Sequence, residues 1–297
     1  MIESYESYKQ MINDHLLDYM PSVDQKSNSL YESMKYSLIA GGKRLRPVLL
    51  LAACEFAGGN AMEALPYAVA MEYIQTYSLI HDDLPSMDND DLRRGLPTNH
   101  KVFGDGIATL AGDGLLTSAF EVMAKDMYLF FDDLPKIKRR INATYAIAKG
   151  AGVRGMVAGQ VSDMESETKQ CSNEMLEYIH LNKTGALIVS AIRAGLYLGG
   201  ADDAMMKNMT AYAENLGLAY QITDDILDVD GSVDELGKKT GVDAVQNKIT
   251  YVSLNGLEKS KERLEELTAA AVDAIAEYYD NAEFFRDLVL DLSKRKR

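Results

Sequence analysis

The second half of this chain contains no proline, and this absence is the sequence feature that most favours long helices there. The sequence has 297 residues and 6 prolines, and the last proline is Pro135. Proline interrupts helices because its ring clashes with the preceding turn and because it has no backbone N–H to donate. Beyond Pro135 the helix-forming residues Leu, Ala, Met, Glu and Lys dominate, and apolar residues recur at spacings of three and four. This half is therefore predicted to consist of long helices.

The first half shows the same periodicity, interrupted by proline and glycine. The chain has no alternating strand–helix pattern and no glycine-rich dinucleotide-binding turn, so an all-α protein is predicted. No linker-like change in composition divides the sequence, and residues 1–297 are expected to form a single domain. Helices are expected near 5–19, 29–40, 47–57, 61–83, 107–128, 134–151, 156–165, 173–198, 204–228, 260–279 and 284–292.

Composition narrows the class of protein. The chain is 47% hydrophobic with a net charge of −14, which is usual for a soluble globular protein and argues against nucleic acid and anionic membranes as partners. The two cysteines, Cys54 and Cys171, form no disulfide or metal-binding pattern, which favours a reducing cytoplasm. The first ten residues are polar, unlike a signal peptide, and the most apolar segments, 45–57 and 185–201, are too short or too interrupted to cross a bilayer. We therefore expect a soluble cytoplasmic protein and not an integral membrane protein.

A cluster of carboxylates follows an apolar helical run. Asp82-Asp83 and Asp88 come directly after that run, and the basic pair Arg93-Arg94 follows them. Two like charges ~4 Å apart repel by roughly 4 kcal/mol at an effective dielectric of ~20, so either some of the carboxylates are protonated or a multivalent cation lies between them. Oxygen-only ligands favour Mg²⁺ over Zn²⁺, and forked arginine donors match phosphate oxygens. The motif indicates a site for a metal ion and a diphosphate; the alternative is a solvated acidic loop, because Asp pairs also occur elsewhere in this acidic chain.

A second acidic cluster lies in the C-terminal half. At 100° per residue, Gln221, Asp224 and Asp228 fall within about 60° on one helix face. Two aspartates one turn apart destabilise a helix by roughly a few tenths of a kcal/mol unless a counter-ion lies nearby. A basic loop that contains Lys238 follows this cluster. A metal site is therefore preferred to the alternative, an exposed acidic helix face.

Two further motifs are candidates for anion binding. Residues 41–47, GGKRLRP, place three basic side chains and free backbone amides at a helix start, where the helix dipole favours an anion. The alternative is a capped turn with solvated basic residues. Lys183-Thr184-Gly185 interrupts an apolar helix, where a core-facing lysine needs a partner and the glycine indicates a kink or a close approach. The alternative there is a surface lysine whose stem alone is buried.

Together these motifs are more specific than any one of them. GGKRLRP, DDLPSMD followed by RR, KTG, and QITDDILD followed by GK occur in this order. In that order they resemble the trans-isoprenyl diphosphate synthase family, most closely its bacterial farnesyl diphosphate synthases (geranyltranstransferases), over residues 38–256. The resemblance implies an all-α fold of the isoprenoid synthase type, in which about ten or more mostly antiparallel helices surround a deep central cavity. It also implies a cytoplasmic homodimer.

The resemblance further implies roles for individual residues. Asp82 and Asp88, supported by Asp83, would bind two Mg²⁺ ions, and Asp224 with Asp228 nearby would hold a third; Mn²⁺ can replace Mg²⁺. The implied isopentenyl diphosphate site consists of Lys43, Arg46, Gln75 and Arg94. The implied allylic diphosphate site consists of Arg93, Lys183, Lys238, and Thr184 and Gln221, whose oxygens would face the developing cation. The implied catalytic residues are Asp82, Asp83, Asp88, Arg93, Lys183, Asp224 and Lys238.

The implied reaction condenses isopentenyl diphosphate with dimethylallyl or geranyl diphosphate to give farnesyl diphosphate and diphosphate. Tyr77, the fifth residue before Asp82, would set the chain length together with Ser78, because its ring would form the floor of the prenyl pocket. Two departures from the family pattern are Gln75, where many members carry His, and Val252, where a proline is common. Alternatives are a geranylgeranyl diphosphate synthase, a class I terpene cyclase, a non-catalytic synthase subunit and, more distantly, a Mg²⁺-dependent phosphohydrolase.

Overall fold

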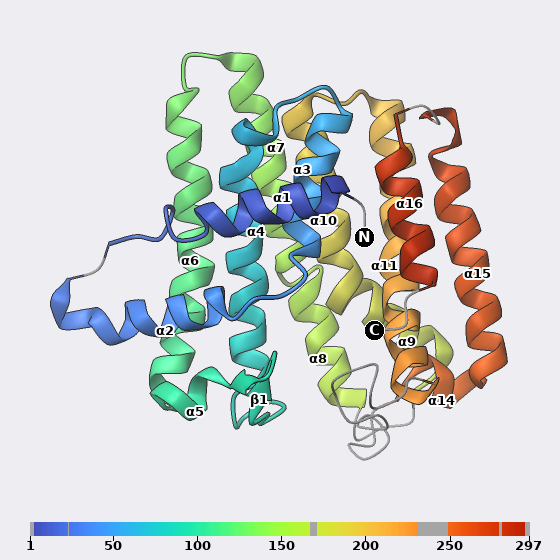
Figure 1. The fold of residues 1–297 in the computed structure, drawn as a ribbon, viewed down its shortest axis with the longest axis horizontal. Helices are drawn as coiled ribbons and strands as arrows, with labels where there is room; N and C mark the ends of the chain where they lie inside the picture. The colour runs from blue at the N-terminus through green and yellow to red at the C-terminus, as the bar shows by residue number, and fades with distance from the viewer. Residues whose placement is uncertain (1–2, 23, 167–170, 231–248, 279–280, 295–297) are drawn as a thin grey trace. The chain divides into compact units, whose positions relative to one another are not determined.

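The computed structural model describes residues 3–22, 24–166, 171–230, 249–278 and 281–294. Within these residues helices dominate, and the two-residue strands β1 (Leu92–Arg93) and β2 (Leu96–Pro97) form one antiparallel hairpin (Figure 1). The prediction of an all-α fold is therefore confirmed. The α-helices are α1 (Glu3–His15), α2 (Asn28–Ile39), α3 (Leu45–Phe56), α4 (Ala61–Asp82), α5 (Asn99–Phe103), α6 (Asp105–Leu129), α7 (Leu134–Ala151), α8 (Met156–Ser166), α9 (Asn173–Ile179), α10 (Ala186–Gly199), α11 (Asp203–Asp230), α14 (Tyr251–Asn255), α15 (Leu257–Ala274) and α16 (Glu283–Ser293), with the short 3₁₀ turns η1 (Gln25–Ser27) and η3 (Ala276–Tyr278).

The largest departure from the predicted helices lies between residues 173 and 198. One continuous helix was expected there, and the structure has α9, then a π-helical segment η2 (His180–Gly185), then α10. A π-helical turn inserts one extra residue and is found mostly at functional sites. The interruption predicted at Gly185 is thus a change of helical type, and the close approach is seen in the neighbouring Gly217, where a Cβ atom would lie 2.9 Å from the Gly185 Cα. The helix expected at 5–19 is also shorter, because α1 ends at His15.

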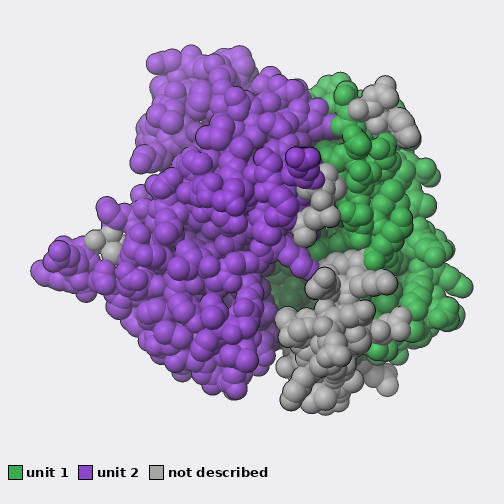
Figure 2. Space-filling model, in the orientation of Figure 1, with its two compact units in different colours: residues 1–2, 146–193, 201–297 green, residues 3–145, 194–200 purple. Residues whose placement is uncertain are grey.

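The chain divides into two compact units, which Figure 2 colours separately. Unit 2 consists of residues 3–145 and 194–200, and unit 1 of residues 1–2, 146–193 and 201–297. Helices α7 and α10 each contribute to both units. The single domain expected for residues 1–297 stays a prediction.

Unit 2 is built on α4. This helix is apolar around most of its circumference, and such a helix is stable when neighbours cover every face. Helices α3 and α6 pack against it, and α2 packs on α6. By length and composition alone α6 could cross a membrane, but here it packs along α4 as a core helix of this unit.

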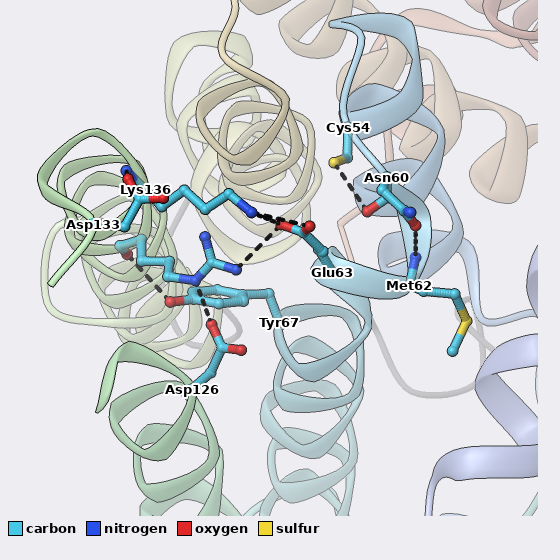
Figure 3. Close-up of polar contacts among 9 residues, drawn as sticks. Cys54, Asn60, Met62, Glu63, Tyr67, Asp126, Asp133 and Lys136 are labelled. Atoms are coloured by element: carbon cyan, nitrogen blue, oxygen red, sulfur yellow. Dashed lines mark hydrogen bonds and ion pairs between the residues drawn. The ribbon is translucent and has the colours of Figure 1, made fainter. Parts of the chain in front are cut away.

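Ion pairs fix the end of α4 that is opposite Asp82 (Figure 3). Asn60 caps the helix by accepting a hydrogen bond from the backbone N–H two residues later at 2.8 Å. Glu63 accepts from Lys136 Nζ at 3.1 Å and lies 3.7 Å from Arg140, which donates from Nε to Asp126 at 2.7 Å. Because Asp126 is on α6 and Lys136 and Arg140 are on α7, these contacts tie three helices together.

Unit 1 is built on α11, which packs against α15, α16 and η2. Glycine allows η2 to lie unusually close to its neighbours. A Cβ atom on Gly159 of α8 would lie 2.1 Å from the backbone nitrogen of Lys183, and one on Gly217 of α11 would lie 2.9 Å from the Cα of Gly185. Any side chain at these two positions would therefore displace the segment that carries Lys183 and Thr184.

Arg44 joins α3 to its neighbours by a buried network. It is the N-cap of α3, with a left-handed backbone (φ 56°), and its side chain is 2% exposed. The guanidinium donates to Asn13 Oδ1 at 3.0 Å, to the carbonyl of Leu38 at 2.6 Å and to the buried carboxylate of Glu72 on α4. Residues 41–47 therefore do not present three basic side chains to a ligand, because one of them points into the core.

We expect Arg44→Met to lower the free energy of unfolding by about 3–5 kcal/mol, because Glu72 would remain buried as an uncompensated charge. Chemical denaturation checks this, and the double variant Arg44→Met/Glu72→Met should lose less stability than Arg44→Met alone. The matched control is Lys9→Met, which removes a surface pair with Glu6 and should cost about 0.5 kcal/mol or less. A loss below about 1 kcal/mol in Arg44→Met would contradict the assignment.

Candidate functional site

The first acidic motif lies where α4 ends. Asp82 is the last residue of the helix, and the chain then turns back so that the backbone N–H of Asp88 donates to the carbonyl of Asp82 at 2.9 Å. Both side chains are partly exposed. The structure therefore brings these two predicted metal ligands together at one helix end.

Asp83, the second aspartate of this motif, has a different environment. It is 3% exposed and accepts hydrogen bonds from Nε of Arg93 at 3.0 Å and from Nη2 of the same residue. Burial raises the pKa of Asp83, and Arg93 opposes that shift. Burial lowers the pKa of Arg93. The hydrogen bond to Asp83 and the negative charges of Asp83, Asp90 and Asp82 outweigh burial, so the pKa of Arg93 is raised overall. Arg93, which was predicted to bind the allylic diphosphate, is thus engaged by the acidic motif itself.

Arg94 links this motif to residues 41–47. Arg94 and Gly95 form the turn of the β1–β2 hairpin with φ values of 55° and 78°, as the turns that best match twisted strands require. The Arg94 guanidinium donates to the carbonyl of Gly41. A Cβ atom on Gly42 would lie 2.5 Å from the guanidinium carbon, so only glycine leaves room for Arg94 there. Two motifs more than fifty residues apart in sequence are thereby brought into contact.

The surroundings of Arg94 are cationic. Burial lowers its pKa, Arg44, Arg93 and Arg46 lower it further, and Glu72 opposes them. Arginines that repel one another in a partly buried place are stabilised by an anion. The structure thus gathers Arg46 and Arg94, two of the four residues predicted to bind isopentenyl diphosphate.

A pocket lies between α2, α4 and the hairpin. Its volume is ≈ 360 Å³, part of which is open to solvent, and its lining includes Thr76, Asp83 and Arg94. The hydroxyl of Thr76 and the side-chain carbonyl of the neighbouring Gln75 are buried and have no hydrogen-bond partner among the described residues. The side-chain oxygen of Gln75, a predicted ligand of isopentenyl diphosphate, therefore has no hydrogen-bond donor among the described residues and lies two helical turns before Asp82.

In unit 1, η2 presents Lys183 and Thr184. Lys183 Nζ donates to Asp163 Oδ2 on α8, and both side chains are partly exposed. The hydroxyl of Thr184 donates to Gln221 Oε1 on α11 at 2.9 Å. Three of the residues predicted to bind the allylic diphosphate thus lie on two packed elements of one unit. The fourth described one, Arg93, belongs to unit 2, and Lys238 lies outside the described residues.

The second acidic motif repeats the arrangement of the first. Asp224 and Asp228 are partly exposed and one turn apart on α11. Between them Asp225 is 4% exposed and accepts a hydrogen bond from the backbone N–H of Tyr251 at 2.7 Å. The first aspartate of each Asp-Asp pair is therefore partly exposed, and the second is buried.

Sequence reasoning missed Asp163, Asp225 and His180. A signal for Asp163 was its place one turn after Gly159 on the same side of a mostly apolar helix. His180 is buried, and its Nε2 lies 3.8 Å from Asp225 Oδ2. Burial lowers the pKa of His180 to about 4, Asp163 opposes this shift and Lys183 adds to it. His180 is therefore neutral at pH 7 and adds no charge to the site.

The exposed carboxylates fit Mg²⁺. No group of three or more His, Cys, Asp or Glu side chains within the described ranges is arranged to hold a metal by itself. Each motif instead offers two carboxylates, Asp82 with Asp88 and Asp224 with Asp228. Mg²⁺ is commonly held by one or two carboxylates, with water and substrate phosphates completing its shell. The donor set therefore fits a metal that binds together with a phosphorylated ligand.

Tyr77 and Ser78 lie on α4 one turn before Asp82. Tyr77 is buried, and its ring meets His81 edge to face with centroids 5.6 Å apart. Burial raises the pKa of Tyr77, and the charge of Asp82 adds to this, which shows how near the ring lies to the acidic motif. His81 Nε2 is 3.0 Å from the carbonyl of Thr109 on α6. Ser78 bonds to the backbone of its own helix.

Comparison with known proteins places this geometry in a family. The model of the polyprenyl synthetase family matches residues 27–282. A farnesyl diphosphate synthase of Geobacillus stearothermophilus is 46% identical over 275 residues, which are 93% of this chain and 90% of that protein. The large subunit 1 of a chloroplastic heterodimeric geranylgeranyl pyrophosphate synthase of Arabidopsis thaliana is 49% identical over 249 residues, and this chain covers 66% of its length.

A crystal structure of an FPP/GFPP synthase from Zymomonas mobilis has a TM-score of 0.85 and 34% identity, with 97% of each chain covered. The fold, the order of the motifs and these identities agree. The chain therefore belongs to the polyprenyl synthetase family.

Proposed function

We propose that this protein is a trans-prenyl diphosphate synthase that condenses isopentenyl diphosphate with dimethylallyl and geranyl diphosphate, giving farnesyl diphosphate and diphosphate. The observation that carries this proposal is the contact of Arg94 with Gly41 and Gly42 beside the first acidic motif. It supports a second diphosphate subsite next to a metal site. A terpene cyclase ionises one diphosphate and has no use for such a subsite.

The chain's own residues divide the work. Asp82, Asp88, Asp224 and Asp228 would hold Mg²⁺, which when bound stabilises negative charge on the departing diphosphate. Lys183 and Arg93 would add positive charge to the allylic diphosphate as its C–O bond breaks. Arg94, Arg46, Lys43 and Gln75 would hold isopentenyl diphosphate so that its double bond attacks the allylic carbon. A proton then leaves the new cation for the released diphosphate.

Product length is the finer part of the proposal. Relatives include both farnesyl and geranylgeranyl synthases. Five residues of helix rise about 7.5 Å, so the ring of Tyr77 on α4 could limit a prenyl tail that runs along the helix from Asp82. The burial of Tyr77 and its contact with His81 support a ring held in one place.

The same proposal includes a cytoplasmic homodimer. On α7, Leu134, Ile141 and Tyr145 are exposed, and their spacing of seven and four puts them on one helix face. Exposed apolar side chains that share a face favour a second protein surface as their neighbour.

Both acidic motifs should be essential. We expect Asp82→Ala and Asp224→Ala each to lower kcat by about 100-fold or more, because each removes a carboxylate from a metal site worth several kcal/mol. Initial rates at saturating Mg²⁺ measure this. The control is Asp132→Ala, an exposed aspartate outside the motifs, which should be unchanged. Near-normal rates in both motif variants would exclude the metal assignment.

The two diphosphate sites should separate in steady-state kinetics. Arg94→Ala should raise the KM for isopentenyl diphosphate by about 10- to 150-fold, the loss of one charge-assisted bond of about 1.5–3 kcal/mol, and Lys183→Ala should act mainly on the allylic substrate. Arg94→Lys should fall between Arg94→Ala and the wild type, because it keeps the charge without the fork. Equal weakening of both substrates in both alanine variants would refute the division.

Tyr77→Ala should remove the floor of the prenyl pocket and so make the pocket deeper. The main product should then change from farnesyl diphosphate to geranylgeranyl diphosphate or longer chains. Tyr77→Phe keeps the ring and should keep the product. Chromatography of the dephosphorylated products measures both variants. If Tyr77→Ala remains active and still stops at farnesyl diphosphate, another residue sets the length.

A further inference from the structure

Asp225 uses both carboxylate oxygens within unit 1, although it lies between two predicted metal ligands. Its Oδ2 accepts from the backbone N–H of Tyr251 at 2.7 Å, and its Oδ1 accepts from Gln221 Nε2 at 3.4 Å. The side chain is 4% exposed. Asp225 is thus turned toward the protein, while Asp224 and Asp228 are partly exposed.

These contacts set the direction of a chain of hydrogen bonds. A side-chain amide has one donor end and one acceptor end, and a carboxylate can only accept. Because Asp225 accepts from Gln221 Nε2, the other end of that amide, Oε1, must face Thr184. The Thr184 hydroxyl therefore donates its proton to Gln221 at 2.9 Å. With its proton committed there, Thr184 can offer only oxygen lone pairs to its other neighbours.

We propose that Asp225 is a positioning residue that fixes the orientation of the Gln221 amide and thereby makes Thr184 an acceptor toward the allylic carbocation. This inference rests on the proposed function and deepens it, because a cation is stabilised by oxygen lone pairs and destabilised by a hydroxyl proton pointing at it. A second contribution of Asp225 is structural. Its bond to the Tyr251 N–H joins α11 to the first turn of α14, which Thr250 and Ser253 also cap.

The two contributions of Asp225 can be separated by one substitution. Asp225→Asn keeps an oxygen for the Tyr251 N–H but turns an NH₂ group toward Gln221. The Gln221 amide must then rotate so that its oxygen accepts from this group, and its own NH₂ faces Thr184. The hydrogen-bond chain is reversed and the Thr184 proton is released, while the contact with α14 remains. A purely structural role would leave kcat unchanged in this variant.

A compensating substitution restores the original direction. In the double variant Asp225→Asn/Gln221→Glu, the new carboxylate at position 221 accepts both from the NH₂ group at position 225 and from the Thr184 hydroxyl. Thr184 donates again, and the net charge of the pair is the same as in the wild type. The single variant Gln221→Glu instead places two carboxylates together and serves as the mismatched control.

Steady-state kinetics with both substrates and Mg²⁺, alongside thermal unfolding, tests the proposal. We expect kcat to fall about tenfold or more in Asp225→Asn, with both KM values and the Mg²⁺ dependence within about threefold of the wild type, and to recover at least in part in the double variant. Unchanged kcat in Asp225→Asn, or no recovery in the double variant, would overturn the proposal. If Asp225→Asn does not fold, Thr184→Val should lower kcat much more than Thr184→Ser, because only serine keeps the hydroxyl, and equal kcat values in the two variants would overturn the proposal.

A readout that needs no activity separates this inference from the proposed function. A wild-type protein that forms no carbon–carbon bond would refute the proposed function. The melting temperatures of the wild type, the two single variants and the double variant still form a double-mutant cycle. A double variant more stable than the sum of its parts supports the directed bond between positions 225 and 221, and additive melting temperatures would overturn it.

Discussion

In both acidic motifs the second aspartate of the Asp-Asp pair is buried and accepts a hydrogen bond from a donor within the protein. Two adjacent carboxylates in one open site repel each other strongly unless a cation is always present. Here Asp83 meets the guanidinium of Arg93, and Asp225 meets the backbone N–H of Tyr251. The first aspartate of each pair, Asp82 or Asp224, is partly exposed. The fold therefore buries one carboxylate of each pair against a hydrogen-bond donor and leaves the predicted metal ligand nearer to solvent.

The basic side chains are placed by close backbone contacts. Arg94 fits against Gly42, where any side chain would occupy the position of its guanidinium, and η2 fits against Gly159, where any side chain would meet the backbone of Lys183. Long flexible side chains lose much rotamer freedom when they are held in this way. This conformational entropy is lost when the protein folds. A diphosphate that bound as proposed would therefore find the side chains of Arg94 and Lys183 already oriented. This is the usual source of efficiency in a site that works through electrostatics and positioning.

Periodicity was enough to predict the helical class, and motif order was enough to predict the family. They could not show which way a side chain turns. Arg44 lies between two candidate phosphate ligands in sequence, yet Glu72, from another helix, draws it into the core. Likewise Asp163 and Asp225 acquire their roles only from Lys183 and Tyr251, which lie 20 and 26 residues away in sequence. The π-helical segment η2 packs against α8 and α11, and these contacts between distant segments are not visible in local sequence preferences.

The hydrogen-bond partners of Asp83 and Asp225 differ in how a bound phosphate would affect them. Arg93 is a side chain, 30% exposed, and its donors face Asp83 and Asp90. A diphosphate that approached it would compete with these carboxylates for the same guanidinium. The Tyr251 N–H is a neutral backbone donor at the first position of the capped helix α14, where no carbonyl of the same helix accepts from it. A diphosphate bound as proposed would therefore compete for the charged partner of the first motif, whereas the orientation of Gln221 and Thr184 depends on an aspartate held by a neutral backbone donor.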